Sequence, residues 1–163
     1  MIVSDVSELP DVAALAAARG RLRVLARPGA VDPLVDGLRD TVDGDVRLAL
    51  GRACTTATRA VEHLTGVLQL PYAATRGLGD FLDALGDRPS AERRWLVVAD
   101  AAELLRHEEH EVWLDLVRDL FGGPHCLGGG WSTLVLVDDP YGWERSRFGT
   151  AAAAEAAGRW TEG

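Results

Sequence analysis

Short apolar runs alternate with amphipathic segments along most of the chain, a pattern typical of a parallel β-sheet covered by helices. Residues 46–50, 95–99 and 131–137 are apolar runs with the length of buried strands. Residues 56–68 repeat apolar side chains at helical spacing before Pro71, which cannot continue a helix. The pattern predicts the α/β class, with a small parallel sheet of three or four strands packed with helices.

Two further helices are predicted in the second half of the chain. Residues 112–121 place apolar side chains on one helical face, and a Gly-Gly-Pro sequence at 122–124 then stops the helix. Asp100 follows the second predicted strand and is a residue type that caps helices, so a short helix is expected over 101–105.

The two ends of the chain extend this central pattern. Residues 21–26 and 31–42 predict a further strand and helix, an extra βα unit at the N-terminal end. Residues 150–160 contain an alanine run that favours helix at the C-terminal end. We therefore divide the chain into an N-terminal extension, a central domain and a partly helical C-terminal extension, at residues 1–44, 45–138 and 139–163.

Length and composition indicate one globular domain, because 163 residues with 47% hydrophobic content can bury a sizeable core. No apolar run approaches the roughly 18 residues of a membrane-spanning helix, and the first residues do not have the features of a signal peptide. Two cysteines, Cys54 and Cys126, cannot build a disulfide framework, so each is expected to be a small buried hydrophobe. These features predict a cytoplasmic protein.

The charge balance is acidic, with 25 Asp and Glu residues against 17 basic residues. The sequence contains no lysine at all. Because phosphate backbones are bound by clustered Lys and Arg, this balance disfavours direct binding of nucleic acid and favours a basic protein partner.

Residues 79–87, Gly-Asp-Phe-Leu-Asp-Ala-Leu-Gly-Asp, form the most informative segment. Asp80, Asp83 and Asp87 follow one another at spacings of three and four, so in a helix their carboxylates share one exposed ridge. The opposite face can then contact a core through Phe81, Leu82 and Leu85.

The three carboxylates differ in their expected roles. Asp80 lies where the helix would begin, so N-capping is its expected role. Asp83 suits both the helix dipole and contact with a partner. Asp87 opposes the dipole and is repelled by Asp83, and a residue that disfavours its own helix is a candidate for function.

The acidic segment resembles the signature of the barstar family of ribonuclease inhibitors, in which a glycine opens a short Leu-Asp-Ala-Leu helix with a second acid four residues later. The resemblance extends over about residues 45–138, in the order of strands and helices. Leu70-Pro71 resembles the Leu-Pro before the inhibitory loop of the family, and residues 113–119 resemble its long second helix.

This resemblance implies a barstar-like fold and an intracellular inhibitor that blocks a secreted basic ribonuclease with its acidic helix and the preceding loop. Carboxylates would replace RNA phosphates in the active site of the ribonuclease. It implies neither enzymatic activity nor a cofactor or metal, and the free protein is expected to be a monomer. The residues that the resemblance assigns to partner binding are Asp83, Asp87, Asp119, Asp80, Tyr72, Gly79 and Gly86.

Two departures from the family pattern keep alternatives open. Gly86 stands where the family often has Trp, and the segment before Gly79 is longer than the usual loop, so Tyr72 only ambiguously matches the tyrosine of the family. These departures favour a diverged barstar-like immunity or binding module for another toxin or partner. A third reading is a small enzyme.

The enzyme reading depends on histidines and one cysteine. His107 and His110 are three apart, whereas the zinc motif His-Glu-x-x-His needs a spacing of four, so we expect a solvated turn there. His125 and Cys126 are adjacent and point in different directions, which does not make a nucleophile and base pair. The glycines at 128–130 lack the Lys and the Ser or Thr that follow in a phosphate-binding loop.

Overall fold

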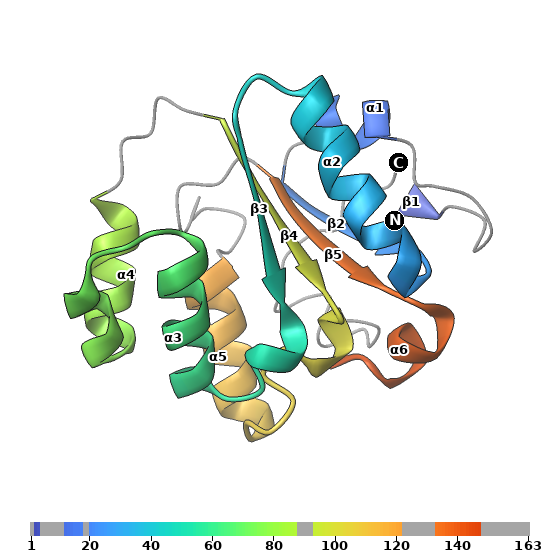
Figure 1. The fold of residues 1–163 in the computed structure, drawn as a ribbon. Coiled ribbons are helices and arrows are strands. Elements are labelled where there is room, and N and C mark those ends of the chain that lie inside the picture. Colours follow the sequence, from blue (N-terminus) through green and yellow to red (C-terminus); the bar gives the residue numbers. More distant parts are fainter. Residues whose placement is uncertain (1, 4–11, 18–19, 88–92, 122–132, 148–163) are drawn as a thin grey trace.

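A computed structural model describes residues 2–3, 12–17, 20–87, 93–121 and 133–147 of the chain. Its centre is an all-parallel β-sheet with the strand order β1-β2-β5-β4-β3 (Figure 1). Strand β1 has two residues, and each of the other four has six. The strands are β1 (Ile2–Val3), β2 (Gly20–Leu25), β3 (Asp45–Leu50), β4 (Arg94–Ala99) and β5 (Thr133–Asp138).

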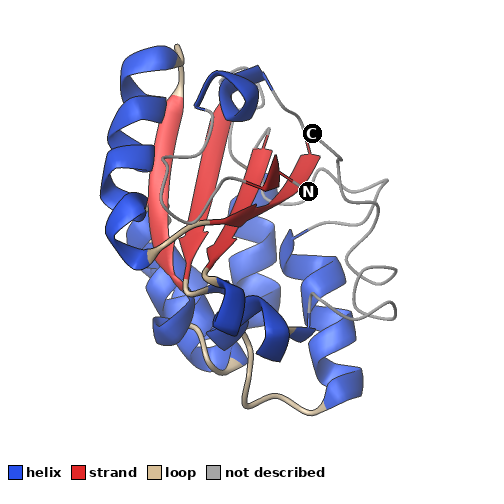
Figure 2. Cartoon of the chain, turned by 90° about the vertical axis from the view of Figure 1, so that its right-hand side faces the viewer, coloured by secondary structure: helices blue, strands red, loops and turns tan. Residues whose placement is uncertain are grey.

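Helices cover both faces of this sheet, which makes a three-layer α/β structure (Figure 2). One face is covered by α1 (Val12–Ala17) and α2 (Val31–Thr41), and the other by α3 (Ala57–Val67), α4 (Leu78–Gly86) and α5 (His110–Phe121). Short 3-10 turns and a last helix connect these elements: η1 (Pro28–Ala30), η2 (Gly51–Ala53), η3 (Tyr72–Arg76), η4 (Ala101–Glu103) and α6 (Pro140–Arg145).

The inner strands β4 and β5 bury side chains on both faces, as expected for a parallel sheet between two helical layers. On the face of α2, Trp95 and Val97 of β4 pack with Leu34 and Leu38, and Trp95 also donates its Nε1–H to the carbonyl of Leu15. The opposite face contains Leu96, Val98, Leu134 and Leu136, packed against Val61, Leu64, Phe81, Leu85 and Trp113. The predicted fold class is therefore confirmed.

The predicted elements lie where the sequence placed them, with small shifts. Thr56 is the N-cap of α3 and accepts a hydrogen bond from the backbone N–H of Arg59 at 3.3 Å. Asp100 precedes the turn η4 with a left-handed backbone, φ 52°, and without a side-chain capping bond, so the predicted cap is wrong. Residues 150–160 lie outside the described residues.

The segment 1–44 contributes β2, which lies inside the sheet between β1 and β5. β2 pairs with β5 along all six residues, from Gly20 opposite Thr133 to Leu25 opposite Asp138. The predicted βα unit thus belongs to the same sheet as β3, β4 and β5, and the division at residues 44 and 138 stays a prediction. Among the described helices, none is long and apolar enough to cross a membrane.

Candidate functional site

The carboxyl edge of the sheet is the first place to look for a site, because open parallel sheets bind ligands where neighbouring strands lead the chain to opposite faces. In this sheet that point lies between β2 and β5. The chain leaves β2 towards α2 on one face and leaves β5 towards α6, whose Trp143 packs against the core of the other face. The indole N–H of Trp143 also donates to the carbonyl of Val24 at 3.0 Å and so fixes α6 to β2.

Asp138, the last residue of β5, connects three elements at this edge. Its carboxylate accepts hydrogen bonds from the backbone N–H of Ala102 at 2.7 Å and of Asp139 at 2.9 Å. Its carbonyl oxygen accepts from the N–H of Ala26 at 3.0 Å, just beyond β2. Asp139 in turn caps α6, since its Oδ1 accepts from the N–H of Gly142 at 2.6 Å.

The environment of Asp138 raises the pKa of its carboxyl group above its ordinary value. Burial is the main cause, because it disfavours the charged form, and the nearby charges of Asp139 and Asp100 act in the same direction. The two backbone hydrogen bonds act in the opposite direction but are outweighed. Because both carboxylate oxygens already accept bonds from the protein, Asp138 holds β5, η4 and α6 together.

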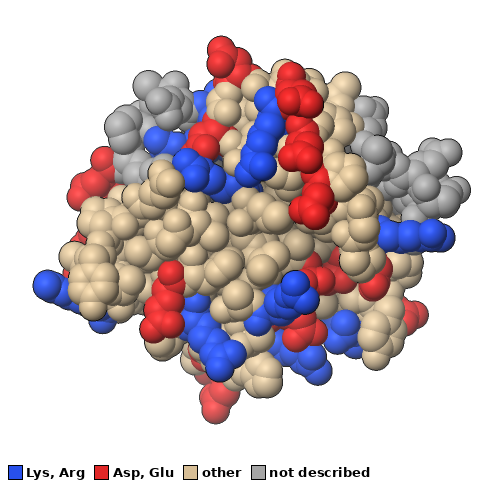
Figure 3. All heavy atoms as spheres, in the orientation of Figure 1, with Lys and Arg blue, Asp and Glu red and all other residues tan. Residues whose placement is uncertain are grey.

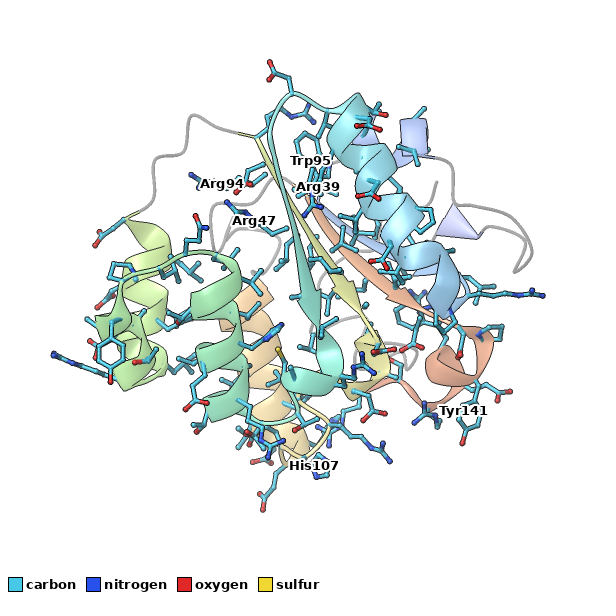
Figure 4. The ribbon with its side chains drawn as sticks, viewed as in Figure 1. Arg39, Arg47, Arg94, Trp95, His107 and Tyr141 are labelled. Carbon is cyan, nitrogen blue, oxygen red and sulfur yellow. The ribbon has the colours of Figure 1, made fainter. Side chains whose placement is uncertain are left out.

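Glu103 forms a second charged group beside η4. It accepts hydrogen bonds from Arg106 at 2.9 Å and from Arg145 at 3.2 Å, and the guanidinium of Arg145 also lies over the exposed ring of Tyr141, 4.3 Å from its centroid (Figure 4). Burial raises the pKa of Glu103, but the hydrogen bonds and charges of the two arginines outweigh burial and lower it overall. The carboxylates of Asp138 and Glu103 are therefore hydrogen-bonded to other groups of the same chain. Among the described residues, no cluster of metal-binding side chains occurs.

Nucleotide-hydrolysing proteins carry a phosphate-binding loop of the form Gly-x-x-x-x-Gly-Lys-Ser/Thr between a strand and a helix, and the turn from β2 to α2 also joins a strand to a helix. Here the turn is residues 26–30, Ala-Arg-Pro-Gly-Ala, with one glycine and no lysine. Pro28 has no backbone N–H to offer a phosphate. Asp32 places a negative charge in the first turn of α2, where an anion would otherwise bind.

The site residues predicted from sequence lie away from the carboxyl edge. They belong to the helical layer of α3, α4 and α5, on the face of the sheet opposite to α2. Six of them lie close together on η3, on α4 or at the end of α4, and all six are exposed: Tyr72, Gly79, Asp80, Asp83, Gly86 and Asp87. Tyr72 is 85% exposed. Asp119 lies in α5, and its side chain is outside the described residues. The exposed ridge predicted for Asp80, Asp83 and Asp87 is thus on α4 and at its end, and no finding tests whether it binds a partner.

The predicted cap of this helix is wrong. Gly77 is the N-cap of α4 and makes no side-chain bond, so Asp80 lies three residues into the helix, in its first turn. Asp87 is the C-cap, and its backbone N–H donates to the carbonyl of Asp83 at 3.0 Å. Phe81 and Leu85 are buried as expected.

The histidines and cysteines do not form a catalytic group within the described residues. His107 lies exposed in a turn, and His110 begins α5 and stacks on Trp113 with ring centroids 6.2 Å apart. Cys54 is a fully buried free thiol whose pKa burial raises to about 12, so it remains protonated. Residues 122–132, which contain His125 and Cys126, lie outside the described residues.

The fold and this edge define a class, the open parallel α/β domains in which a nucleotide is commonly bound at the carboxyl ends of the strands. The chain matches no protein-family model and no curated protein. It is similar in structure to Cdc6p from Pyrobaculum aerophilum, with a TM-score of 0.51 and 14% identity over 90% of this chain and 40% of that one.

Two Drosophila assemblies give similar results. In a structure of ORC bound to poly(dA/dT) DNA and Cdc6, the matched chain has a TM-score of 0.53 and 17% identity over 92% of this chain and 26% of that one. In a structure of ORC bound to AT-rich DNA and Cdc6, the matched chain has a TM-score of 0.52. The two chains are 18% identical, and the match covers 91% of this chain and 26% of that one. The present chain therefore spans less than half the length of these proteins and is similar in fold to the part of each that it matches.

These neighbours overturn the expected family and its function. The structural matches are Cdc6 and ORC proteins and not barstars, so the predicted ribonuclease inhibitor, immunity protein and ribonuclease partner are wrong. The expectation of a partner without direct binding of nucleic acid is corrected too, since the matched Drosophila structures are of ORC bound to DNA. The resemblance rested on one amphipathic acidic helix and on an order of strands and helices that consecutive βαβ units share in many parallel folds.

Proposed function

We propose that this chain is a binding domain built on the fold of Cdc6 and ORC proteins, and that it does not hydrolyse nucleoside triphosphates. The turn between β2 and α2 carries this proposal. It joins a strand to a helix, as a phosphate-binding loop does, but offers Pro28, a single glycine and no lysine. A triphosphate would meet no lysine anywhere in the chain.

The carboxyl edge supports the same conclusion. A hydrolase of this kind needs carboxylates that are free to hold Mg²⁺ beside the phosphates. Asp138 is instead bonded to Ala102 and Asp139, and Asp100 lies 3.5 Å from the guanidinium of Arg52 in an ion pair. The side chains at this edge therefore stabilise the fold.

The structural neighbours support a role in an assembly. Both Drosophila structures are complexes of ORC with Cdc6 and DNA, so domains of this fold occur in multi-protein complexes. We propose that this chain likewise acts by binding other macromolecules, with a protein as the principal partner and in the cytoplasm. The free buried thiol of Cys54 supports a reducing compartment.

A phosphate-release assay with ATP or GTP and Mg²⁺ tests whether the chain hydrolyses nucleoside triphosphates. We expect the purified chain to release phosphate no faster than the same chain after heat denaturation. Asp100→Asn and Asp32→Asn are the matched variants, because both remove one carboxylate near the carboxyl edge and only Asp100 lies where a strand of the central sheet ends. A Mg²⁺-dependent release that Asp100→Asn abolishes and Asp32→Asn retains would contradict the proposal.

Direct binding of DNA is the second candidate, and the DNA in both Drosophila structures favours it. Fluorescence anisotropy of labelled single-stranded and double-stranded DNA tests it. Binding carried by phosphate contacts should weaken steeply as salt rises. Anisotropy that stays constant at all protein concentrations would remove this candidate and leave the protein partner.

A further inference from the structure

The outer edge of β3 offers backbone groups to a further strand. β3 is the last strand of the sheet on one side, and the N–H of Asp45 donates inward to the carbonyl of Arg93. Because successive residues of a strand direct their backbone groups to opposite sides, the N–H and C=O groups of Val46, Leu48 and Leu50 point outward. Such an edge can pair with another strand.

Two side chains of the same chain already bond to the ends of this edge. The guanidinium of Arg39, on α2, donates to the carbonyl oxygen of Val46 at 3.4 Å, a long contact (Figure 4). The Nε2 of His63, on α3, accepts from the N–H of Leu50 at 3.0 Å. Between these two positions lies Leu48, whose side chain is half-buried.

The two bonded groups are complementary to each other. One is a carbonyl acceptor two residues before Leu48, and the other is an N–H donor two residues after it. If two copies of β3 pair antiparallel about a twofold axis at Leu48, the carbonyl of Val46 in one copy faces the N–H of Leu50 in the other. Arg39 and His63 thus occupy the positions that the second copy would fill.

The side chains along β3 fit the same arrangement. Val46 would face Leu50 of the second copy, Leu48 would face Leu48, and Arg47 would face the small side chain of Ala49. Beyond these pairs, Asp45 would face Gly51 of the second copy, while its carboxylate stays paired with Arg47 at 2.8 Å. The apolar residues at positions 46, 48 and 50 of β3 are therefore complementary to their own reverse order.

The surface around β3 leaves room for apolar contact. Figure 3 shows a band without charged side chains across the middle of this face, where the middle of β3 lies in Figure 1, with charges of both signs above and below it. A neutral band between mixed charges is typical of an interface core with a polar rim.

We propose that the outer edge of β3 binds a second copy of this chain, giving a twofold dimer with one continuous sheet through both copies. Two copies related in this way use the same surface on each side, which is the commonest form of protein oligomer. The proposal does not depend on the absence of hydrolysis, because it rests on β3, α2 and α3.

Sedimentation and light scattering of the full chain from about 1 μM to 1 mM, the range of weak to moderate association constants, test for the dimer. The mass should rise from 17.5 kDa towards twice that value. In Arg39→Ala/His63→Ala the dimer should become tighter by about tenfold, the gain from about one hydrogen bond that no longer competes. A chain and a double variant that both stay monomeric throughout would overturn the proposal.

Cross-linking tests the register. In a Cys126→Ser background, Arg47→Cys should form a covalent dimer with a short bis-maleimide, because residues 47 of the two copies would lie diagonally across the twofold axis at roughly 7–8 Å. Asp83→Cys is the matched control, since it is an exposed charged residue on α4, away from this edge. Cross-linking at Asp83→Cys and not at Arg47→Cys would show that any dimer uses another surface.

Discussion

The imidazole Nε2 of His63 lies 3.0 Å from the backbone nitrogen of Leu50 and accepts its hydrogen bond. This geometry requires the neutral imidazole, because both nitrogens of a protonated ring are donors. Burial also lowers the pKa of His63 from its ordinary value of 6.5. A single α3 residue therefore connects the stability of the β3 edge to pH.

Acidification should destabilise the chain through His63. A lowered folded-state pKa means that the contribution of the neutral ring is fully present above the unfolded pKa and is lost as pH falls through the folded pKa. We expect the free energy of unfolding to fall by about 0.5 kcal/mol between roughly pH 7.5 and 5, the low end for one hydrogen bond because the ring is only half-buried.

His63→Gln is the control for this prediction, since Gln retains an acceptor oxygen that does not titrate in this range. Urea unfolding of both chains at each pH gives the comparison, and the difference between them removes the effects of Glu103 and Asp138, which both chains contain. Parallel pH dependences in the two chains would contradict the role of His63.

Gly142→Ala should destabilise the fold by about 1–3 kcal/mol, the range for a steric overlap in a packed site. A Cβ at Gly142 would overlap the carboxylate of Asp138, whose position is fixed by bonds to Ala102 and Asp139. Urea unfolding measures the loss.

Gly66→Ala is the matched substitution in open space. Gly66 is exposed on α3 with no atom within 4 Å of the added Cβ, so alanine should raise the free energy of unfolding by about 0.5–1 kcal/mol. If both alanine variants changed stability in the same direction, the packing of Gly142 against Asp138 would not be the cause.

Cys54 should not react with thiol reagents in the folded protein. Its side chain is fully buried, and its pKa of about 12 leaves almost no thiolate at neutral pH. The measurement is the rate of reaction with a chromogenic disulfide in a Cys126→Ser background, before and after unfolding in guanidinium. Rapid reaction without denaturant would show that the core around Cys54 opens easily.

The two ends of α4 should respond to loss of a carboxylate in opposite directions. Asp80→Ala removes a favourable charge from the first turn and should cost about 0.3–1 kcal/mol, whereas Asp87→Ala removes an unfavourable one at the C-cap and should be neutral or stabilising by a few tenths. Both effects should shrink in high salt, which screens exposed charges. If both variants lost the same free energy of unfolding in low salt, the helix dipole would not be the cause of either change.

Local pattern predicted most of the sheet and its coverings. Residues 46–50, 95–99 and 131–137 were identified as strands because apolar runs of that length suit a buried parallel strand, and β3, β4 and β5 occupy nearly those ranges. The sequence also predicted that Asp80, Asp83 and Asp87 are exposed on one helix, and all three are exposed on α4 or at its end, since helical spacing is a local property.

The carboxyl edge could not be predicted in the same way. Asp138 was given no role, because its bond to Ala102 spans 36 residues and exists only when β4 and β5 are neighbours. The short helix α6 has little periodicity of its own, and its position depends on the bond from Trp143 to Val24, 119 residues away. The family assignment failed for a related reason, since a motif of nine residues does not determine which strands are neighbours.

The position of β2 inside the sheet has a consequence for the order in which the sheet can form. Among the strands that the structure describes, β2 is the first with six residues, yet its only full-length neighbour is β5, about 110 residues later. During synthesis β2 therefore stays unpaired along most of its length, while β3 and β4 are already available to pair with each other. Folding should then be completed late, when residues 133–138 insert between two preformed halves of the molecule.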